Sequence, residues 1–156
     1  MTSEELHLLR TLLHRQPVAA LATLHKGEPA VSMVPFAVWP ERQVLLVHVS
    51  ALSTHTQDMQ RHPGVSLLVT GQEANTPLAL PRVSVTGQAR TIERESADHA
   101  HARSIYLAKL PDAEPLFDFG DFSLVAISPT SLRFVAGFGR AMALVGERMA
   151  EVWQPV

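Results

Sequence analysis

Apolar residues recur along this chain with a helical period in three segments. Leucines at helical spacing follow Thr2 and Glu5, which have the spacing of a capping box, so a helix is predicted over residues 3–15. A second, short helix is predicted to end near residue 62, and a third to cover residues 95–110.

Other apolar runs alternate with polar residues or are bounded by turn residues, as strands are. A tight turn at residues 25–28, whose glycine supplies positive φ, joins the first two predicted strands. Pro35 lies inside the second strand and lacks a ladder donor, which indicates a sheet edge or a bulge. Residues 129–131, "PTS", are predicted to be the turn between the last two strands, and residues 72–81 and 111–121 to be loops. The predicted strands cover residues 18–24, 29–38, 44–49, 65–71, 82–92, 122–128 and 132–139.

Strands that follow one another through short turns favour antiparallel pairing over parallel units with crossover helices. Six or seven such strands, apolar over much of their length, are typical of a small closed barrel. At 156 residues the chain is expected to form one domain, with no repeat and no linker between domains. The fold class predicted is therefore mainly β, with peripheral helices.

Composition and charge exclude several classes of protein. There is no cysteine, which rules out disulfide scaffolds, thiolate zinc sites and cysteine nucleophiles. The formal net charge is −2 with both signs interspersed, which is unlike a nucleic-acid-binding surface. The N-terminus lacks the features of a secretory signal, and no apolar run is long enough to span a membrane. We expect a cytoplasmic protein that binds neither nucleic acid nor membrane.

The spacing of the histidines, serines and acidic residues matches no common metal-binding or hydrolase motif. The chain has eight histidines, but no pair at i, i+4 and no HExxH motif, so surface histidines are the default interpretation and no metal site is predicted. There is no GxSxG nucleophile motif. Glu93, Glu95 and Asp98 flank a predicted helix start, where acidic residues favour the helix dipole in any case.

The segment "SALSTHTQDM", residues 50–59, crowds hydroxyl groups around His55 between two apolar strands. One hydroxyl suffices to cap the short helix that follows. A helix N-terminus with free amides, hydroxyls and an imidazole also forms a phosphate cradle, and the two interpretations are compatible. The hydroxyl residues are Ser50, Ser53, Thr54 and Thr56.

Two further features suit an anionic, planar ligand but have simpler explanations. Arg82 opens a strand directly after a proline, and its guanidinium could donate two hydrogen bonds to a phosphate or lie at an exposed strand end. In "GFGRA", residues 137–141, two glycines flank an aromatic residue. They would let the backbone approach a flat group, or mark a bulge or a barrel corner.

Together these segments resemble the FMN-binding split-barrel superfamily of pyridoxamine 5′-phosphate oxidase, and most of all its haem-utilisation branch. The resemblance covers residues 5–145 and rests on "ATLHKGEPAVSMVPFAV", "SALSTHTQDMQRHPGVSLLV", "PRVSVTG" and "FVAGFGRA" in this order. It implies a six-stranded antiparallel split barrel that forms a homodimer, with FMN bound in clefts at the dimer interface. It also implies a domain over residues 1–145 and a C-terminal tail over residues 146–156.

The resemblance assigns cofactor-binding roles to three regions. The second strand would run beside the flavin ring, the hydroxyl cluster would hold the phosphate, and residues after the last predicted strand would approach the ring, from the other subunit. The residues so implied are Ser32, Met33, Val34, Pro35, Ser50, Ser53, Thr54, His55, Thr56, Arg82, Phe138 and Arg140.

The chain also departs from its relatives. True pyridoxamine phosphate oxidases carry cations at positions occupied here by Ser32, Ala37, Thr54 and His55, which argues against that reaction. Haem-utilisation relatives read "HTRN" where this chain reads "HTQD", so a cationic phosphate partner is missing. Haem-degrading members use an iron-ligating histidine in a C-terminal loop, whereas the last histidine here is His101.

The expected function is that of an FMN-binding flavoprotein, an oxidoreductase whose substrate the sequence does not identify and for which no catalytic residue is named. The protein would supply cofactor binding while the flavin supplies the redox chemistry. The alternative is a non-enzymatic haem- or flavin-binding protein related to haem utilisation. Haem is the less strongly indicated cofactor of the two.

Overall fold

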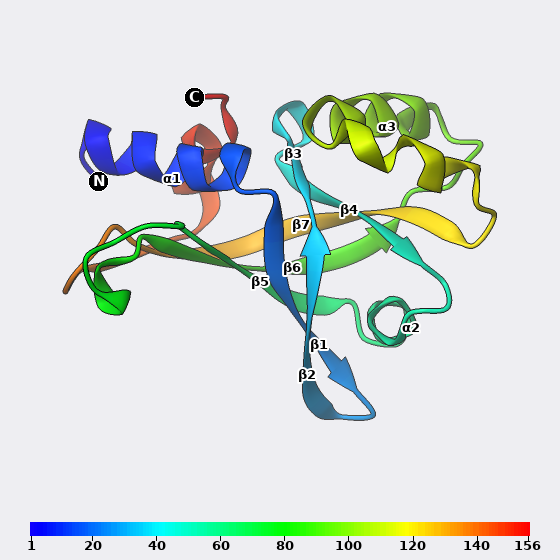
Figure 1. Ribbon diagram of the computed structural model, residues 1–156, viewed down its shortest axis with the longest axis horizontal. Helices are drawn as coiled ribbons and strands as arrows, with labels where there is room; N and C mark the ends of the chain where they lie inside the picture. Colours follow the sequence, from blue (N-terminus) through cyan, green and yellow to red (C-terminus); the bar gives the residue numbers. More distant parts are fainter.

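One antiparallel sheet with helices packed on it forms the framework of the computed structural model, which describes residues 1–156 (Figure 1). Three α-helices and four short 3₁₀ helices are interspersed among eight strands. In chain order the elements are α1 (Ser3–Arg15), β1 (Val18–His25), β2 (Glu28–Pro35), β3 (Ala37–Trp39), η1 (Pro40–Arg42), β4 (Val44–Ser50), α2 (Thr54–Arg61), β5 (Gly64–Thr70), η2 (Pro77–Ala79), β6 (Arg82–Thr91), α3 (Ala97–Lys109), η3 (Pro111–Asp118), β7 (Phe122–Val135), β8 (Ala141–Leu144) and η4 (Gly146–Trp153).

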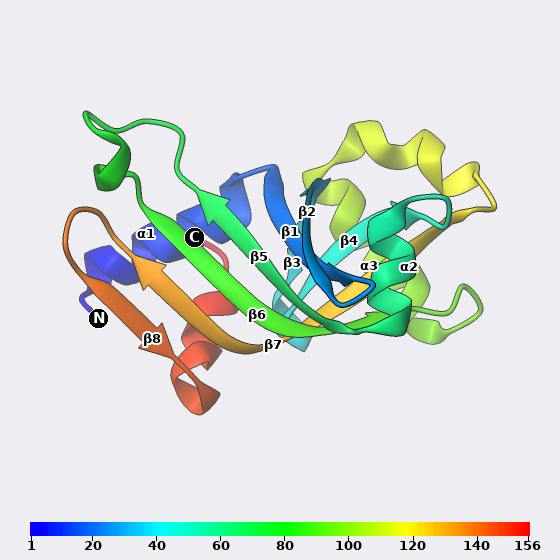
Figure 2. The ribbon, with the colours of Figure 1, turned by 90° about the horizontal axis from the view of Figure 1, so that it is seen from below.

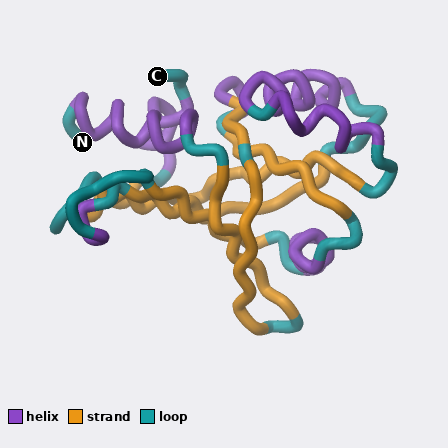
Figure 3. Tube along the Cα trace, in the orientation of Figure 1, coloured by secondary structure: helices purple, strands orange, loops and turns teal.

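The strands pair in the order β2-β1-β5-β6-β7-β4-β3, and β8 pairs with β7. Every pairing is antiparallel, as predicted, but the strand count is eight rather than six and the ladder leaves the sheet open (Figure 3). The two edge strands, β2 and β3, are consecutive pieces of one chain segment joined at Phe36. The backbone N–H of Phe36 donates to the carbonyl of Pro17 at 3.2 Å, which holds the bend where Pro35 ends β2. The prediction that Pro35 marks a sheet edge is confirmed.

Side chains on opposite faces of the strands build two cores. The larger core fills the inner face of the sheet and is closed by leucines of α1 together with Val152 and Trp153 of η4. The smaller core lies under α3, where Tyr106 packs on the other face of β3 and β4. The longest α-helices, α1 and α3, have 13 residues each, and no helix is long and apolar enough to cross a membrane.

The local predictions for the first third of the chain are confirmed. The helix α1 begins with the Thr2–Glu5 capping box, in which each residue's side chain accepts a hydrogen bond from the other's backbone N–H. The β1–β2 turn places Lys26 and Gly27 at φ 52° and 83°, the left-handed region that such tight hairpins need. In Figures 1 and 3 this hairpin extends below the rest of the sheet.

The last strands differ from the prediction, because "PTS" is not a turn. Residues 122–135 form the single strand β7, and Thr130 is an extra residue at a bulge opposite Thr86 and Gly87. The Thr130 hydroxyl donates to the carbonyl of Thr86 at 3.1 Å, so Pro129 sits where the regular ladder is interrupted. "GFGR" is instead the turn to β8, with Gly139 at φ 92°. Both predicted loops also contain a 3₁₀ turn, η2 and η3.

We predict that Gly87→Ala destabilises the protein by about 1–3 kcal/mol, because the new methyl group overpacks the bulge. A Cβ at Gly87 would lie 2.5 Å from the carbonyl oxygen of Ser128, a backbone atom that cannot easily move. Urea unfolding measures the loss. The matched control is Gly120→Ala, where a Cβ meets nothing within 4 Å. Equal stability of the two variants would contradict the close approach at the bulge.

Candidate functional site

A cavity of about 450 Å³ lies between β2, the N-terminal end of α2, the C-terminal end of α3 and η3. It brings together five of the predicted cofactor-binding residues, which are Met33, Val34, Pro35, Ser53 and His55. Its volume is within the range of small-molecule sites, and its remaining walls are largely apolar. Three residues of the second strand and two of the hydroxyl-rich segment, Ser53 and His55, therefore lie at one cavity.

The hydroxyl groups of the cluster have different surroundings. Ser53 is the N-cap residue of α2, yet its side chain makes no capping hydrogen bond. Ser50 Oγ donates to Asp121 Oδ2 at 2.6 Å and accepts from the backbone N–H of Leu52 at 3.1 Å, so it fixes the loop before α2. Thr54 is exposed. Only Ser53 among these hydroxyls lines the cavity.

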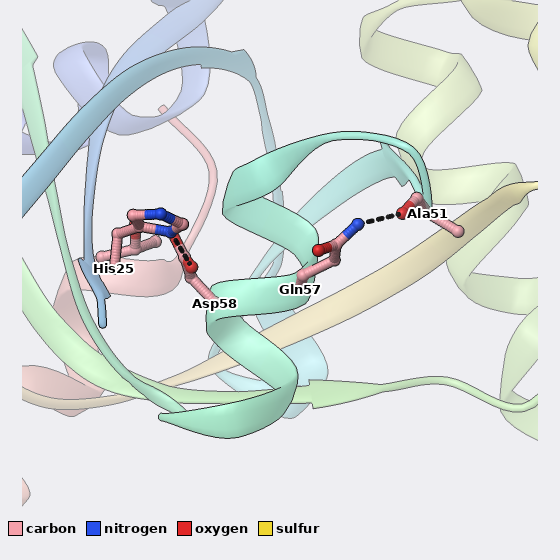
Figure 4. Close-up of polar contacts among 5 residues, drawn as sticks. His25, Ala51, Gln57 and Asp58 are labelled. Carbon is pink, nitrogen blue, oxygen red and sulfur yellow. Dashed lines mark hydrogen bonds and ion pairs between the residues drawn. The ribbon is translucent and has the colours of Figure 1, made fainter. Parts of the chain in front are cut away.

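The two residues that depart from the relatives' pattern hold α2 in place (Figure 4). Asp58 is 2% exposed, and its carboxylate bonds His25 Nδ1 at 2.8 Å and accepts from the Thr23 hydroxyl at 3.1 Å, both on β1. Gln57 Nε2 donates to the carbonyl of Ala51 at 3.4 Å. Burial raises the pKa of Asp58, but the hydrogen bonds from His25 and Thr23 outweigh it and hold the pKa below its usual value. The negative charge of Asp58 therefore serves to hold α2 on β1.

Other predicted residues lie outside the cavity. Thr56 is buried on the opposite side of α2, where it lines a separate hollow of about 330 Å³ beside Arg90, and its hydroxyl has no hydrogen-bond partner. Ser32 alternates with Met33 along β2, and its hydroxyl is also buried without a partner. Neither residue contributes to a cradle at the α2 N-terminus within this chain.

Arg82 opens β6, and Phe138 and Arg140 lie on the turn between β7 and β8. In Figure 2 this turn and the start of β6 lie on the side of the sheet away from α2 and α3. Strand β6 runs from Arg82 to Thr91, and only residues at its Thr91 end line a hollow near α2, the separate one beside Thr56. The Arg82 guanidinium donates to the carbonyls of Leu78 and Leu80. Phe138 is 81% exposed on the β7–β8 turn. One chain therefore does not bring these three residues to the cavity.

The sequence analysis did not single out the other cavity residues, among them His48, Tyr106 and Lys109. Lys109 Nζ lies 3.8 Å from the centre of the Phe36 ring and donates to the carbonyl of Leu13, and burial lowers its pKa to about 8. Burial raises the pKa of Tyr106 to about 12, so its hydroxyl stays protonated at neutral pH. The helical spacing of Tyr106 and Lys109 indicates that they share one face of α3. It does not indicate that this face borders the cavity.

The cavity's histidines are neutral near pH 7. Burial lowers the pKa of His55, more than nearby Asp58 raises it. Burial also lowers the pKa of His48 to about 4, with further lowering by Arg94, His99 and Arg103. A neutral imidazole can ligate a metal ion, while Lys109 offers a cation for an anionic group. The arrangement suits a flat apolar ring that carries a negatively charged arm, and it offers no evident general base.

The chain is similar to several known proteins over most of its length. The model of the family described as pyridoxamine 5′-phosphate oxidase matches residues 6–136. The chloroplastic heme oxygenase HOZ of Arabidopsis thaliana is 37% identical over 150 residues, which is 94% of this chain but 44% of that protein. Heme oxygenase HutZ of Vibrio cholerae is 27% identical over 135 residues, covering 84% of this chain and 76% of HutZ. A heme binding protein from Mycobacterium smegmatis superposes with a TM-score of 0.85 at 27% identity, over 96% of this chain and 61% of that one.

We predict that Asp58→Asn lowers the free energy of unfolding at pH 7, since the amide cannot replace the charged partner of His25. The native carboxylate's pKa is held below its usual value of 3.8, so its contribution is full above that pH and is lost as the pH falls through the native pKa. The stability gap between wild type and variant should therefore narrow in acid. Urea unfolding between pH 7 and pH 2 measures it, with the exposed Asp112→Asn as control. A gap that stays constant with pH would refute the charged anchor.

Proposed function

This chain belongs to the pyridoxamine 5′-phosphate oxidase family, and from that premise we propose that it binds haem in the cavity beside α2. The observation that carries the proposal is an apolar cavity of about 450 Å³ into which one end of a helix brings His55. The proposal concerns binding. It does not extend to haem breakdown, because the chain spans less than half of the plant relative's length and carries no histidine after His101.

The relatives' names favour haem over a flavin as the ligand. The plant and Vibrio proteins are named heme oxygenases, and the mycobacterial structure is described as a heme binding protein. The alternative function expected from the sequence thus has more support than an FMN-dependent oxidoreductase. Within the cavity, Met33, Val34 and Leu116 offer the apolar surface that a porphyrin needs.

Two polar residues of the cavity have a role in this proposal. His55 would supply a neutral imidazole nitrogen to the iron. Lys109 pairs with a propionate, and an anion at that position would favour its charged form against the burial that lowers its pKa to about 8. When bound, haem supplies a redox-active iron whose potential depends on the axial ligand and the surrounding polarity.

FMN is a second candidate for the same cavity, supported by a different observation. The Ser53 hydroxyl at the start of α2 makes no capping bond and is available to a phosphate. Against this, Gln57 stands where relatives carry a cation, and Asp58, three residues after His55, adds a negative charge. We expect FMN to bind more weakly than haem.

We also propose that the functional unit is a homodimer. The outer faces of β1, β2 and β5 form a continuous apolar stripe that no helix covers, in which Val31 is 72%, Met33 65% and Leu68 40% exposed. A patch of this kind usually marks an interface. A second copy on this stripe could bring its Arg82 and Phe138 to the cavity that one chain leaves open. A cytoplasmic location remains a prediction.

Titration with haemin tests the binding proposal. We predict a saturable Soret shift at micromolar protein, and at least a tenfold loss of affinity in His55→Ala, because a ligand bond to iron is lost. Since burial holds the pKa of His55 below 6.5, ligation should persist at pH 6.5 and weaken in more acidic solution. The matched control is His62→Ala, an exposed histidine just beyond α2.

Two results would separate the alternatives. A Soret shift identical in wild type and His55→Ala would remove His55 as the ligand. No response to haemin, together with quenching of FMN fluorescence that is lost in Ser53→Ala, would replace haem by the flavin.

The homodimer has its own test in Val31→Asp. A charge in the middle of the apolar stripe should convert the dimer to a monomer while the fold is kept, because Val31 is largely exposed in one chain. Light scattering after size-exclusion chromatography measures the mass. Val145→Asp, equally apolar and 57% exposed but distant from the stripe, is expected to remain dimeric. Wild-type protein that runs as a monomer would contradict the proposed assembly.

A further inference from the structure

A second, smaller cavity of about 180 Å³ lies between α3, the C-terminal end of η3 and the outer face of β4. It is separate from the proposed cofactor cavity, although His48 and Phe122 border both. Four nitrogen-bearing side chains gather at it from three parts of the chain. They are His48 of β4, Arg94 of the loop after β6, and His99 and Arg103 of α3.

Two buried nitrogen atoms at this cavity have no hydrogen-bond partner. His48 is only 8% exposed, and its Nδ1 is buried without a donor or acceptor beside it. Arg103 Nε is likewise buried and unpaired. Buried polar groups nearly always have a partner, because an unmade hydrogen bond there is costly. Two such atoms on the wall of one cavity indicate that something polar completes the site.

The folded structure holds these groups in place without neutralising them. The His48 ring stacks on Phe117, with ring centres 3.8 Å apart and planes 9° from parallel. Arg103 lies over the same Phe117 ring at 5.2 Å and is 3.8 Å from Glu114, a distant ion pair. Arg94 donates to the carbonyls of Phe119 and Phe122, which leaves its charge uncompensated.

The charges around the cavity favour an anion. Arg94 and Arg103 are positive, Asp118 is the one carboxylate in the lining, and Glu114 lies behind Arg103. Burial and the two arginines lower the pKa values of His48 and His99, which is the effect expected where positive charge is concentrated. An arginine pair with two imidazoles can donate several hydrogen bonds to the oxygen atoms of one tetrahedral group. No group of three metal-ligating side chains lies here or elsewhere in the protein.

We propose that this cavity is a binding site for a small oxyanion of the phosphate type, either inorganic phosphate or the phosphoryl group of a small monoester. Arg94 and Arg103 supply the charge, and His48 and His99 supply further hydrogen bonds. Both arginines and His99 belong to this cavity alone, whereas His48 borders the cofactor cavity as well. His99 on α3 and Asp118 on η3 are in contact with solvent, so an anion can enter the cavity from that side.

Inorganic phosphate, sulfate and glycerol phosphate are the probes that test this site. In the apo protein, phosphate should raise the melting temperature in a saturable way above sodium chloride of equal ionic strength. Arg103→Met and His99→Gln should each weaken the apparent affinity about tenfold, as expected for loss of a charge-assisted hydrogen bond. Arg133→Met, a change of an exposed arginine on β7, is the matched control and should keep wild-type affinity. Glycerol phosphate binding as tightly as phosphate would indicate a monoester.

Nuclear magnetic resonance gives a readout that does not depend on variant stability. Phosphate should shift the ring nitrogen signals of His48 and His99 in wild-type protein and leave the exposed His7 unchanged. Because these signals come from wild-type protein, they test the phosphate site even if Arg103→Met does not fold. Unshifted His48 and His99 signals at saturating phosphate would overturn the proposal. So would a stabilisation that is equal in wild type, His99→Gln and the chloride reference.

Discussion

The position of α2 depends on the hydrogen bonds that the buried Asp58 carboxylate makes with β1. The candidate site depends on them in turn, because α2 carries Ser53 and His55. An eight-residue helix is too short to be stable alone and relies on contacts with the rest of the fold. The bonds from His25 and Thr23 tie Asp58 to β1, while Met59 packs into the main core. The same pairing turns the opposite end of the helix, with Ser53 and His55, toward β2 and α3. A residue pair that departs from the relatives' pattern is thus explained by its structural role.

The two ends of the folded protein carry different functional features. At one end, α2, α3 and η3 enclose the large apolar cavity and the small basic one, with His48 between them. At the other end lie Arg82 and the exposed turn with Phe138, which make no contact with either cavity. The apolar stripe across β2, β1 and β5 is left exposed in one chain. A site completed by a second copy would use all three features, whereas a monomer would leave them unexplained.

Much of the fold could be predicted from the sequence, since its signals are local. The capping box, the Lys26–Gly27 turn and the proline at the sheet edge each follow from neighbouring residues. The continuous strand β7 could not be predicted, because "PTS" has turn composition and only pairing with Thr86 and Gly87, some 40 residues earlier, makes it a bulge. The same limit applies to the site. Its hydroxyls and His55 were visible in one short segment, but the Asp58–His25 pair and the approach of Lys109 depend on distant contacts.

The absorbance spectrum of the protein, purified from cells supplied with a haem precursor, tests the central claim most directly, because haem, flavin and empty protein differ in it. The account predicts a Soret band of histidine-ligated haem that is absent when His55→Ala is purified in the same way. A flavin spectrum, or a colourless protein that stays colourless after haemin is added, would contradict the claim that the cavity beside α2 is a haem site.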